Sequence, residues 1–166
     1  MLSINEINKI DKSEFLTLFG NIFENTEWIA NKVFNFKPYI STEKLLSKFT
    51  EVYENANDEE ILKIFNSHPN LAVEKKLTKD SSNEQIGANL NQCSEEEFSE
   101  FLKLNEEYKN KFKFPFIIAV KGKDKNEILE IFKKRINNTN QKEFEEAKKQ
   151  VKKIAVIRFN QIFNIS

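Results

Sequence analysis

The chain has 166 residues, which is the size of one ordinary domain and enough to bury a hydrophobic core without disulfides or metal ions. Its 39% apolar and 31% charged residues suit a globular protein, and 3 Gly and 3 Pro are too few for a disordered or turn-rich all-β chain. Acidic and basic side chains balance at 26 each, so no net field attracts a polyanion, and we expect no nucleic-acid partner.

The cysteine content and the hydropathy of the chain indicate its cellular compartment. The single Cys93 cannot form an internal disulfide, and one Cys with one His cannot build a Cys/His zinc site. No apolar run approaches the roughly 18 residues of a membrane span, and residues 1–9 lack the apolar stretch of a signal peptide. We therefore expect a cytoplasmic protein with no membrane partner.

Three helices are predicted first, because apolar side chains recur at three- and four-residue spacing. One begins near Ser13 and one at Thr26, where Pro38 later interrupts the pattern. A third follows Thr42.

A fourth helix begins at Asn57, because Glu60 three residues later completes a pattern typical of a capping box. This helix must stop near His68-Pro69, since the residue before a proline is pushed out of the α region.

Four more helices are predicted in the second half. One is opened by Ser81-Ser82. The others begin at capping-box pairs: Ser94 with Glu97, Asp124 with Glu127, and Asn140 with Glu143. Residues 114–120 are apolar, β-branched and Pro-bearing, which indicates a buried, extended segment whose amides need partners. The sequence thus predicts an all-α fold, a single-domain irregular bundle of about seven or eight helices over residues 1–166.

His68 is the only histidine, and it lies at a helix end before Pro69. One interpretation is structural, because a protonated imidazole suits a helix C-terminus. The other is catalytic: histidine is the side chain that titrates near neutrality without help, so His68 is the first candidate for proton transfer.

Residues 81–85 place hydroxyl, amide and carboxylate groups within one or two turns. An N-cap with an acidic first turn would explain them without any function. The apolar neighbours Ile86 and Leu90 indicate that part of the segment is buried, and a buried Glu84 would need a partner.

Arginine occurs only at Arg135 and Arg158, in a chain rich in lysine. Each is informative, because lysine would serve for surface charge but lacks the planar two-pronged donor. Arg158 lies on the apolar stripe of the last predicted helix, one turn after Ile154. It either extends to solvent or faces a cavity and selects a carboxylate or carbonyl oxygen.

These segments, in this order, resemble the 2-oxo-4-hydroxy-4-carboxy-5-ureidoimidazoline (OHCU) decarboxylase family. The motifs that match are His68-Pro69-Asn70-Leu71-Ala72, Ser81-x-x-Glu84-Gln85, Phe114-Pro115-Phe116-Ile117 and Ile154-Ala155-x-x-Arg158. Residues 15–38 are similar to the family's opening pair of helices, so the resemblance spans nearly the whole chain. The family usually has Asp in place of Asn70, often Gly in place of Val73, and a small residue or Gly in place of Asn89. Such departures bear on how the His68 loop is held and on catalytic efficiency.

The resemblance implies an all-α homodimer that decarboxylates OHCU to S-allantoin without a metal or an organic cofactor, after urate oxidation and 5-hydroxyisourate hydrolysis. It implies that the catalytic residues are His68, Glu84 and Arg158. It further implies substrate contacts from Pro69, Ser81, Gln85, Phe116, Ile117, Ile118, Ala119, Val120 and Lys121.

In this hypothesis the charge left by the loss of CO2 is delocalised into the conjugated ring and then quenched by a proton from His68, which fixes the hand of the product. Glu84 orients the imidazole or the substrate hydroxyl, and Arg158 anchors a charged or carbonyl oxygen. The polar side chains of residues 81–85 hold the ring and ureido groups, while the amides of residues 117–121 bind the polar edge of the ring.

Two alternatives remain open. A non-enzymatic helical interaction module is supported only by the amphipathic pattern, and convergence of the three catalytic side chains on one cleft bordered by residues 116–121 would exclude it. A decarboxylase or lyase of another small ureido acid is the second alternative, which substrate assays would distinguish.

Overall fold

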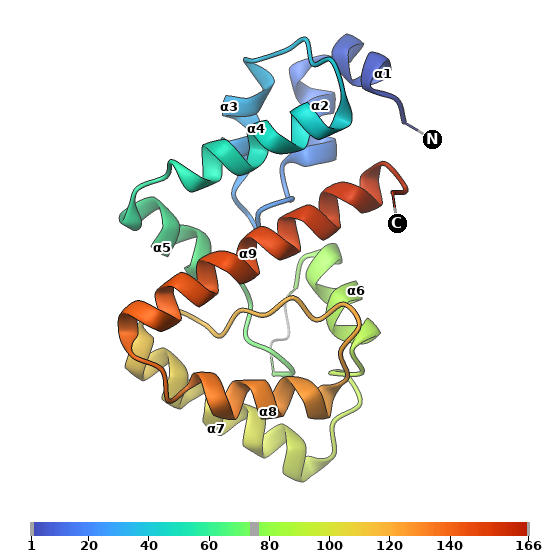
Figure 1. The fold of residues 1–166 in the computed structure, drawn as a ribbon. Helices are drawn as coiled ribbons and strands as arrows, with labels where there is room; N and C mark the ends of the chain where they lie inside the picture. Colours follow the sequence, from blue (N-terminus) through green and yellow to red (C-terminus); the bar gives the residue numbers. More distant parts are fainter. Residues whose placement is uncertain (1, 74–76, 166) are drawn as a thin grey trace. The chain divides into compact units, whose positions relative to one another are not determined.

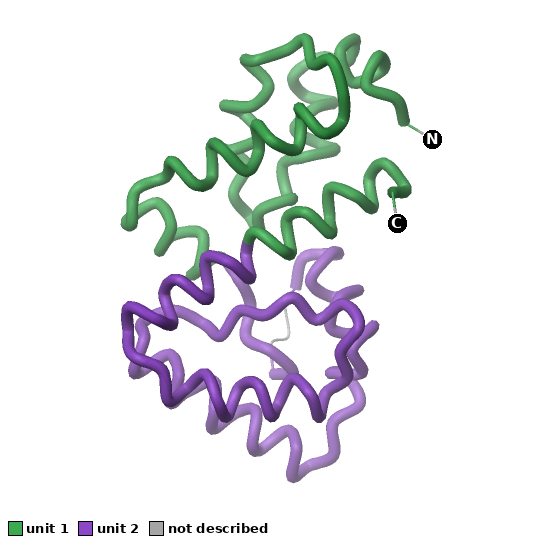
Figure 2. Tube along the Cα trace, in the orientation of Figure 1, with its two compact units in different colours: residues 1–67, 152–166 green, residues 68–151 purple. Residues whose placement is uncertain are grey.

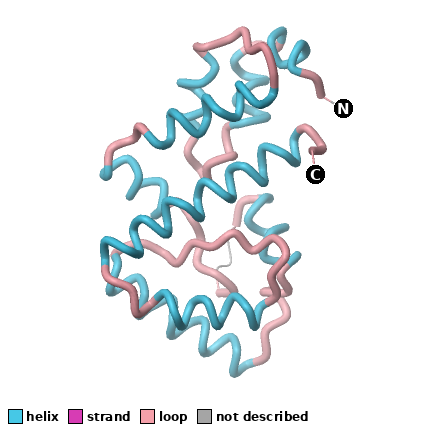
Figure 3. Tube along the Cα trace, in the orientation of Figure 1, coloured by secondary structure: helices cyan, strands magenta, loops and turns pink. Residues whose placement is uncertain are grey.

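The computed structural model describes residues 2–73 and 77–165. Within these ranges every regular element is an α-helix, and no strand occurs (Figure 3), so the all-α prediction is confirmed. The helices of the described residues are α1 (Ile4–Lys9), α2 (Lys12–Phe19), α3 (Glu27–Phe34), α4 (Thr42–Glu54), α5 (Asp58–Asn66), α6 (Lys79–Gly87), α7 (Glu95–Phe112), α8 (Lys125–Arg135) and α9 (Asn140–Ile162) (Figure 1). The helix beyond the expected seven or eight is α1, which opens with a capping box at Ser3.

Local capping signals set most helix starts. Ser41 caps α4, and its hydroxyl accepts a hydrogen bond from the Lys44 amide. Reciprocal capping boxes open α5, α7 and α8, each with the predicted pair of residues: Asn57 with Glu60, Ser94 with Glu97, and Asp124 with Glu127. These starts were predictable because both partners lie within one turn of the chain.

Two predicted helix caps are wrong, although α9 does begin at Asn140. Thr78, not Ser81, caps α6, and the Thr78 hydroxyl accepts a hydrogen bond from the Ser81 amide at 3.2 Å. In α9 the Thr139 hydroxyl accepts from the Lys142 amide at 3.3 Å, so Asn140 is not the cap. Glu143 is instead fully buried within the first turn of α9, where it accepts hydrogen bonds from Arg135.

The chain forms two compact units (Figure 2): unit 1 comprises residues 1–67 and 152–166, and unit 2 comprises residues 68–151. Helix α9 contributes residues to both units. The expected single domain over residues 1–166 stays a prediction.

Unit 1 has an aromatic core built by α2, α4 and the C-terminal part of α9. The Phe19 ring lies 4.6 Å from Phe15, 5.6 Å from Phe49 and 6.0 Å from Phe159, measured between centroids. Tertiary packing of this kind, rather than helix propensity, supplies most of the stability of helices this short.

Unit 2 has a second aromatic core, which bears directly on the site. The Phe116 ring stacks on Phe132 of α8 at 3.8 Å and meets Tyr108 of α7 edge-on at 5.3 Å. The segment that carries Phe116 therefore packs against both α7 and α8.

None of the helices in residues 2–73 and 77–165 combines the length and the apolar character needed to span a lipid bilayer.

Candidate active site

His68 is the first residue of unit 2 and follows the end of α5. The helix ends at Asn66, as the proline at position 69 predicts. Both His68 and Pro69 are half-buried. The imidazole is thus carried on a loop whose geometry depends on what holds residues 70–72.

Two side-chain amides clamp that loop. Gln85 of α6 accepts a hydrogen bond from the Ala72 amide at 3.0 Å and donates one to the Asn70 carbonyl at 3.3 Å. Asn105 of α7 donates to the Leu71 carbonyl at 3.0 Å. Three successive residues after the His68-Pro69 pair are thereby fixed, which is the support that a catalytic group on a loop requires.

Ala72 adopts φ +64°, a left-handed conformation that is uncommon for a residue with a side chain. The hydrogen bond from its amide to Gln85 helps to maintain that conformation. Gln85, expected from the resemblance to contact substrate, therefore also has a structural partner at each end of its amide. One N–H of its NH2 group remains for another acceptor, since each side-chain amide nitrogen carries two donors.

Helix α6 carries the other polar residues of the predicted site. Ser81 and Gln85 lie one turn apart, which places them on one helix face, and both are buried. Glu84 is half-buried beside them. The interpretation of Ser81 as an N-cap is excluded, because that role belongs to Thr78.

Asn89 closes α6 in a left-handed conformation with φ +58°. Its amide bonds to the Ile86 carbonyl and the Leu90 amide to the Gln85 carbonyl, both at 2.9 Å, which together form a Schellman motif. Glycine is favoured at such a position and asparagine tolerates it, so this departure from the family pattern is compatible with the same backbone.

The segment of residues 114–120 is entirely buried and has no regular secondary structure, as predicted, while the following Lys121 is exposed. Its polar backbone atoms bond to side chains of unit 2. The Ile117 carbonyl accepts from Arg135 at 2.7 Å. The Ala119 amide donates to Gln150 at 3.0 Å, and the Ala119 carbonyl accepts from Lys123 at 3.1 Å.

The amides of Ile118 and Val120 are different. Neither amide donates a hydrogen bond to a described residue of unit 2. Buried amides in proteins almost always have a partner, so these two are candidate donors to a bound molecule.

A buried hydrogen-bond network that was not predicted from the sequence contacts this segment at the Ile117 carbonyl. Arg135 donates to one Glu143 oxygen through Nε at 2.8 Å and through Nη2 at 2.6 Å. The hydroxyl of Tyr108 donates to the same oxygen at 2.5 Å. Burial, and then the hydrogen bond to Glu143, raise the pKa of Tyr108 well above its usual range, so its hydroxyl stays a donor. The scarcity of arginine in this chain was the signal that could have found Arg135.

Arg158 belongs to unit 1 and is almost fully buried, so the interpretation that it extends to solvent is wrong. Its Nη2 lies 2.7 Å from a carboxylate oxygen of Glu24, which is also buried. Its Nη1 donates to the Asn21 carbonyl at 3.0 Å. Its planar fork therefore already binds one carboxylate and one carbonyl, the two kinds of oxygen that a buried guanidinium is expected to select.

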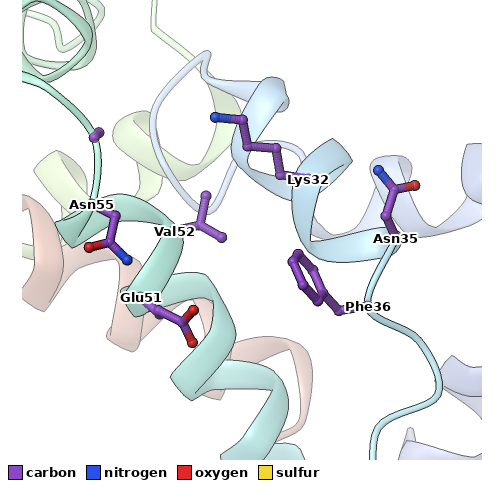
Figure 4. A pocket seen from close by; sticks show the side chains of 7 residues that line it. Lys32, Asn35, Phe36, Glu51, Val52 and Asn55 are labelled. Carbon is purple, nitrogen blue, oxygen red and sulfur yellow. The ribbon is translucent and has the colours of Figure 1, made fainter.

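An open pocket lies in unit 1 between the end of α3 and α4 (Figure 4). Phe36 and Lys32 border one side, and Glu51 lies on the other. Its full lining is Lys32, Asn35, Phe36, Glu51, Val52, Asn55 and Ala56. None of these residues was predicted to act on substrate.

In residues 2–73 and 77–165, no three His, Cys, Asp or Glu side chains are grouped so as to hold a metal ion.

Comparison with known proteins identifies related sequences. Residues 8–160 match the sequence profile of OHCU decarboxylases. A uric acid degradation bifunctional protein of Bacillus sp. (strain TB-90) is 40% identical over 163 residues, which cover 98% of this chain but 32% of that protein. This chain thus spans about a third of that relative. The OHCU decarboxylase of Haloferax volcanii is 31% identical over 98% of this chain and 97% of its own length.

Solved structures show the same fold. A crystal structure of (S)-allantoin synthase matches 100% of this chain and 54% of its own, with a TM-score of 0.80 at 21% identity. A crystal structure of OHCU decarboxylase in the presence of (S)-allantoin matches 93% of this chain and 99% of its own, with a TM-score of 0.73 at 23% identity.

Proposed function

Because this chain belongs to the OHCU decarboxylase family, we propose that it decarboxylates OHCU to (S)-allantoin in the degradation of urate. One structural observation carries the proposal. The two hydrogen bonds of Gln85 tie the loop after His68 to the helix that also bears Glu84. A proton donor and a carboxylate that could orient it are thus held on connected elements of one unit.

The chemistry needs few parts. The bond between the ring carbon and the carboxylate breaks and CO2 leaves. The electron pair forms a double bond to the neighbouring ureido-bearing carbon, and the ring nitrogen of the former C=N bond takes up a proton. Protonated His68 then delivers its proton to the ureido-bearing carbon from one side, which fixes the hand of the product, and the hydroxyl on the adjacent carbon loses its proton to become a carbonyl. A positioned general acid of this kind contributes typically about 10² to 10⁴ in rate.

Glu84 and Arg158 have supporting roles in this proposal. Glu84 orients the imidazole or the substrate hydroxyl, and its half-buried position suits a carboxylate that contacts a polar group. Arg158 anchors a charged or carbonyl oxygen of the substrate through donors of its fork, in addition to its bond with Glu24.

Neutral groups would recognise the ring and the ureido chain. Ser81 and the remaining N–H of Gln85 bond to the ureido and ring oxygens, and Pro69 packs against the substrate. The amides of Ile118 and Val120 donate to the polar edge of the ring, which would satisfy two buried donors. Hydrogen bonds made in a dry, fixed site are stronger than the same bonds made in water.

The test is turnover of freshly generated OHCU. The protein is mixed with urate in the presence of urate oxidase and 5-hydroxyisourate hydrolase, and allantoin formation is followed by circular dichroism. We expect fast formation of one enantiomer, whereas spontaneous decay gives a racemic product. Decay at the uncatalysed rate would refute the proposal and favour the interaction module, and activity only on another ureido acid would favour the second alternative.

We also propose that the protein acts in the cytoplasm as a homodimer with no nucleic-acid partner. The balanced charge of 26 acidic and 26 basic residues supports the absence of a nucleic-acid partner, and the single Cys93 fits a reducing compartment. The homodimer is proposed from the family resemblance alone. Light scattering coupled to size-exclusion chromatography measures the mass directly, and 19.6 kDa would identify a monomer and contradict the dimer.

A further inference from the structure

The guanidinium of Arg135 makes contacts through all three of its nitrogens and through its planar face. Two of its nitrogens bond to Glu143, and the third, Nη1, donates to the Ile117 carbonyl. Its face lies 4.4 Å from the centroid of the Phe116 ring. With Nε and Nη2 held on Glu143, Nη1 lies against the Ile117 carbonyl, in the segment that carries the candidate amides.

Glu143 is fixed as well. One oxygen accepts from Tyr108 and from Arg135, and the other accepts from Asn138 at 2.7 Å. The side chain is 0% exposed. The network therefore joins α7, α8 and the first turn of α9 to the Ile117 carbonyl.

Stability alone is a poor explanation for this buried ion pair. Desolvation of two charges offsets most of their attraction, and well-packed apolar side chains often stabilise such a site equally well. An apolar pair could not, however, hold a carbonyl group in one orientation.

Holding the Ile117 carbonyl also orients the next amide. The peptide bond is planar, and the described X-Pro cis bond lies elsewhere, so this bond is trans and the Ile118 N–H points away from the Ile117 oxygen. Arg135 thus determines the direction of the Ile118 donor. Lys123 binds the Ala119 carbonyl and determines the direction of the Val120 donor in the same way.

We propose that Arg135, locked by Glu143, is a positioning residue that aims the Ile118 amide at the substrate. The inference rests on the proposed function, in which this amide binds the polar edge of OHCU. In this role Arg135 acts through the Ile117 peptide and not by contact with substrate, since each of its three nitrogens bonds to Glu143 or to Ile117.

The test is the Arg135→Lys variant. A single ammonium keeps the charge beside Glu143 but cannot bond to both the carboxylate and the Ile117 carbonyl. We expect kcat/KM for OHCU to fall about 10²-fold, the scale of a misplaced binding group distant from the reacting atoms. Lys133→Met is the matched control, since it removes a cation from the same helix whose partner, Glu100, lies on the surface. The control should keep wild-type kcat/KM.

A readout without substrate separates the inference from the proposed function. Amide resonances of residues 118–120, observed by NMR, should shift in Arg135→Lys and not in Lys133→Met. A folded Arg135→Lys protein with wild-type kcat/KM, or with unshifted resonances at Ile118, overturns the inference. If the wild-type protein fails to act on OHCU, the proposed function fails, and the NMR comparison alone decides whether Arg135 orients the segment.

A second variant keeps the test valid if Arg135→Lys does not fold. The double variant Arg135→Met/Glu143→Gln removes both charges together, so no charge is left buried and unpaired. The new amide oxygen still accepts from Tyr108. We expect this protein to fold and to lose at least as much kcat/KM, and wild-type kcat/KM in it would overturn the inference.

Discussion

Arg158 Nη2 lies 2.7 Å from Glu24 Oε2, and the two side chains are only 4% and 1% exposed. This ion pair joins the last helix to the turn after α2 within unit 1. Arg158 is therefore neither a surface arginine nor an unpartnered cation, and its role in substrate binding has to be separated from its role in packing.

Removing the partner of Arg158 should destabilise the fold. Glu24→Gln removes the carboxylate charge that lies 2.7 Å from the buried guanidinium, and breaking a buried ion pair typically costs about 3–5 kcal/mol. The free energy of unfolding in urea measures it. Glu59→Gln is the control, because it breaks the pair of Lys63 and Glu59 whose side chains are 72% and 79% exposed, and the midpoint should not change. Equal midpoints for both variants would contradict the importance of the buried pair.

Arg158→Lys tests substrate binding. The variant keeps a positive charge beside Glu24 but loses the fork that also bonds to the Asn21 carbonyl. We expect KM for OHCU to rise about tenfold, the equivalent of about 1.4 kcal/mol, while the protein stays folded. An unchanged KM in a folded variant would show that Arg158 serves only to hold Glu24.

Tyr108→Phe tests the buried network of unit 2. The hydroxyl donates to Glu143, and a hydrogen bond to a charged group contributes about 1.5–3 kcal/mol. The free energy of unfolding at pH 8 should fall by that amount.

The same variant predicts a pH dependence. Burial, followed by the bond to Glu143, raises the pKa of folded Tyr108, whereas an unfolded tyrosine titrates near about 10. The contribution of the hydroxyl is thus complete below about pH 10 and is lost as the pH rises above it, because only the unfolded chain then releases the proton. The difference between wild type and Tyr108→Phe should narrow between pH 8 and 11. A constant difference would contradict this assignment.

The helix starts that could be predicted are those set by residues close together in the sequence. Asn57 with Glu60, for example, forms a reciprocal pair within one turn, so composition and spacing suffice. Asn140 with Glu143 has the same spacing, yet Glu143 bonds to Arg135 and Tyr108 instead. Nothing in the local pattern distinguishes a capping glutamate from one whose partner comes from another helix.

The candidate site was predictable to a similar extent. The resemblance selected Gln85, but not the fact that it clamps the loop after His68, since that bond joins residues 13 apart in sequence. Between the two arginines, the apolar stripe drew attention to Arg158, while Arg135 at the end of α8 looked like an ordinary C-terminal cation. Partners contributed by distant elements become visible only in the folded chain.

Activity should survive exhaustive chelation. The chain has one His and one Cys, and the described residues contain no group of three metal-ligating side chains. Turnover of OHCU is measured after dialysis against EDTA, with and without added zinc or magnesium. A loss that either metal restores would contradict the cofactor-free mechanism.

His68→Asn is the most direct test of the proposed mechanism. Asparagine keeps part of the size and hydrogen bonding of the imidazole but cannot transfer a proton at the pH of the assay. We expect kcat on OHCU to fall by about 10² to 10⁴, the usual scale for one general acid or base. The melting temperature should stay nearly unchanged, because His68 is half-buried on a loop that Gln85 and Asn105 hold through the backbone of residues 70–72.

Asn66→Ala is a suitable control for His68→Asn. Asn66 lies two residues earlier on the exposed end of α5, and its amide bonds only locally, to the Leu62 carbonyl. This variant should retain wild-type kcat and melting temperature. Unfolding of His68→Asn alone would show that the imidazole is structural. Near-normal turnover in folded His68→Asn would instead assign proton transfer to Glu84 or to water, because no other histidine exists to replace it.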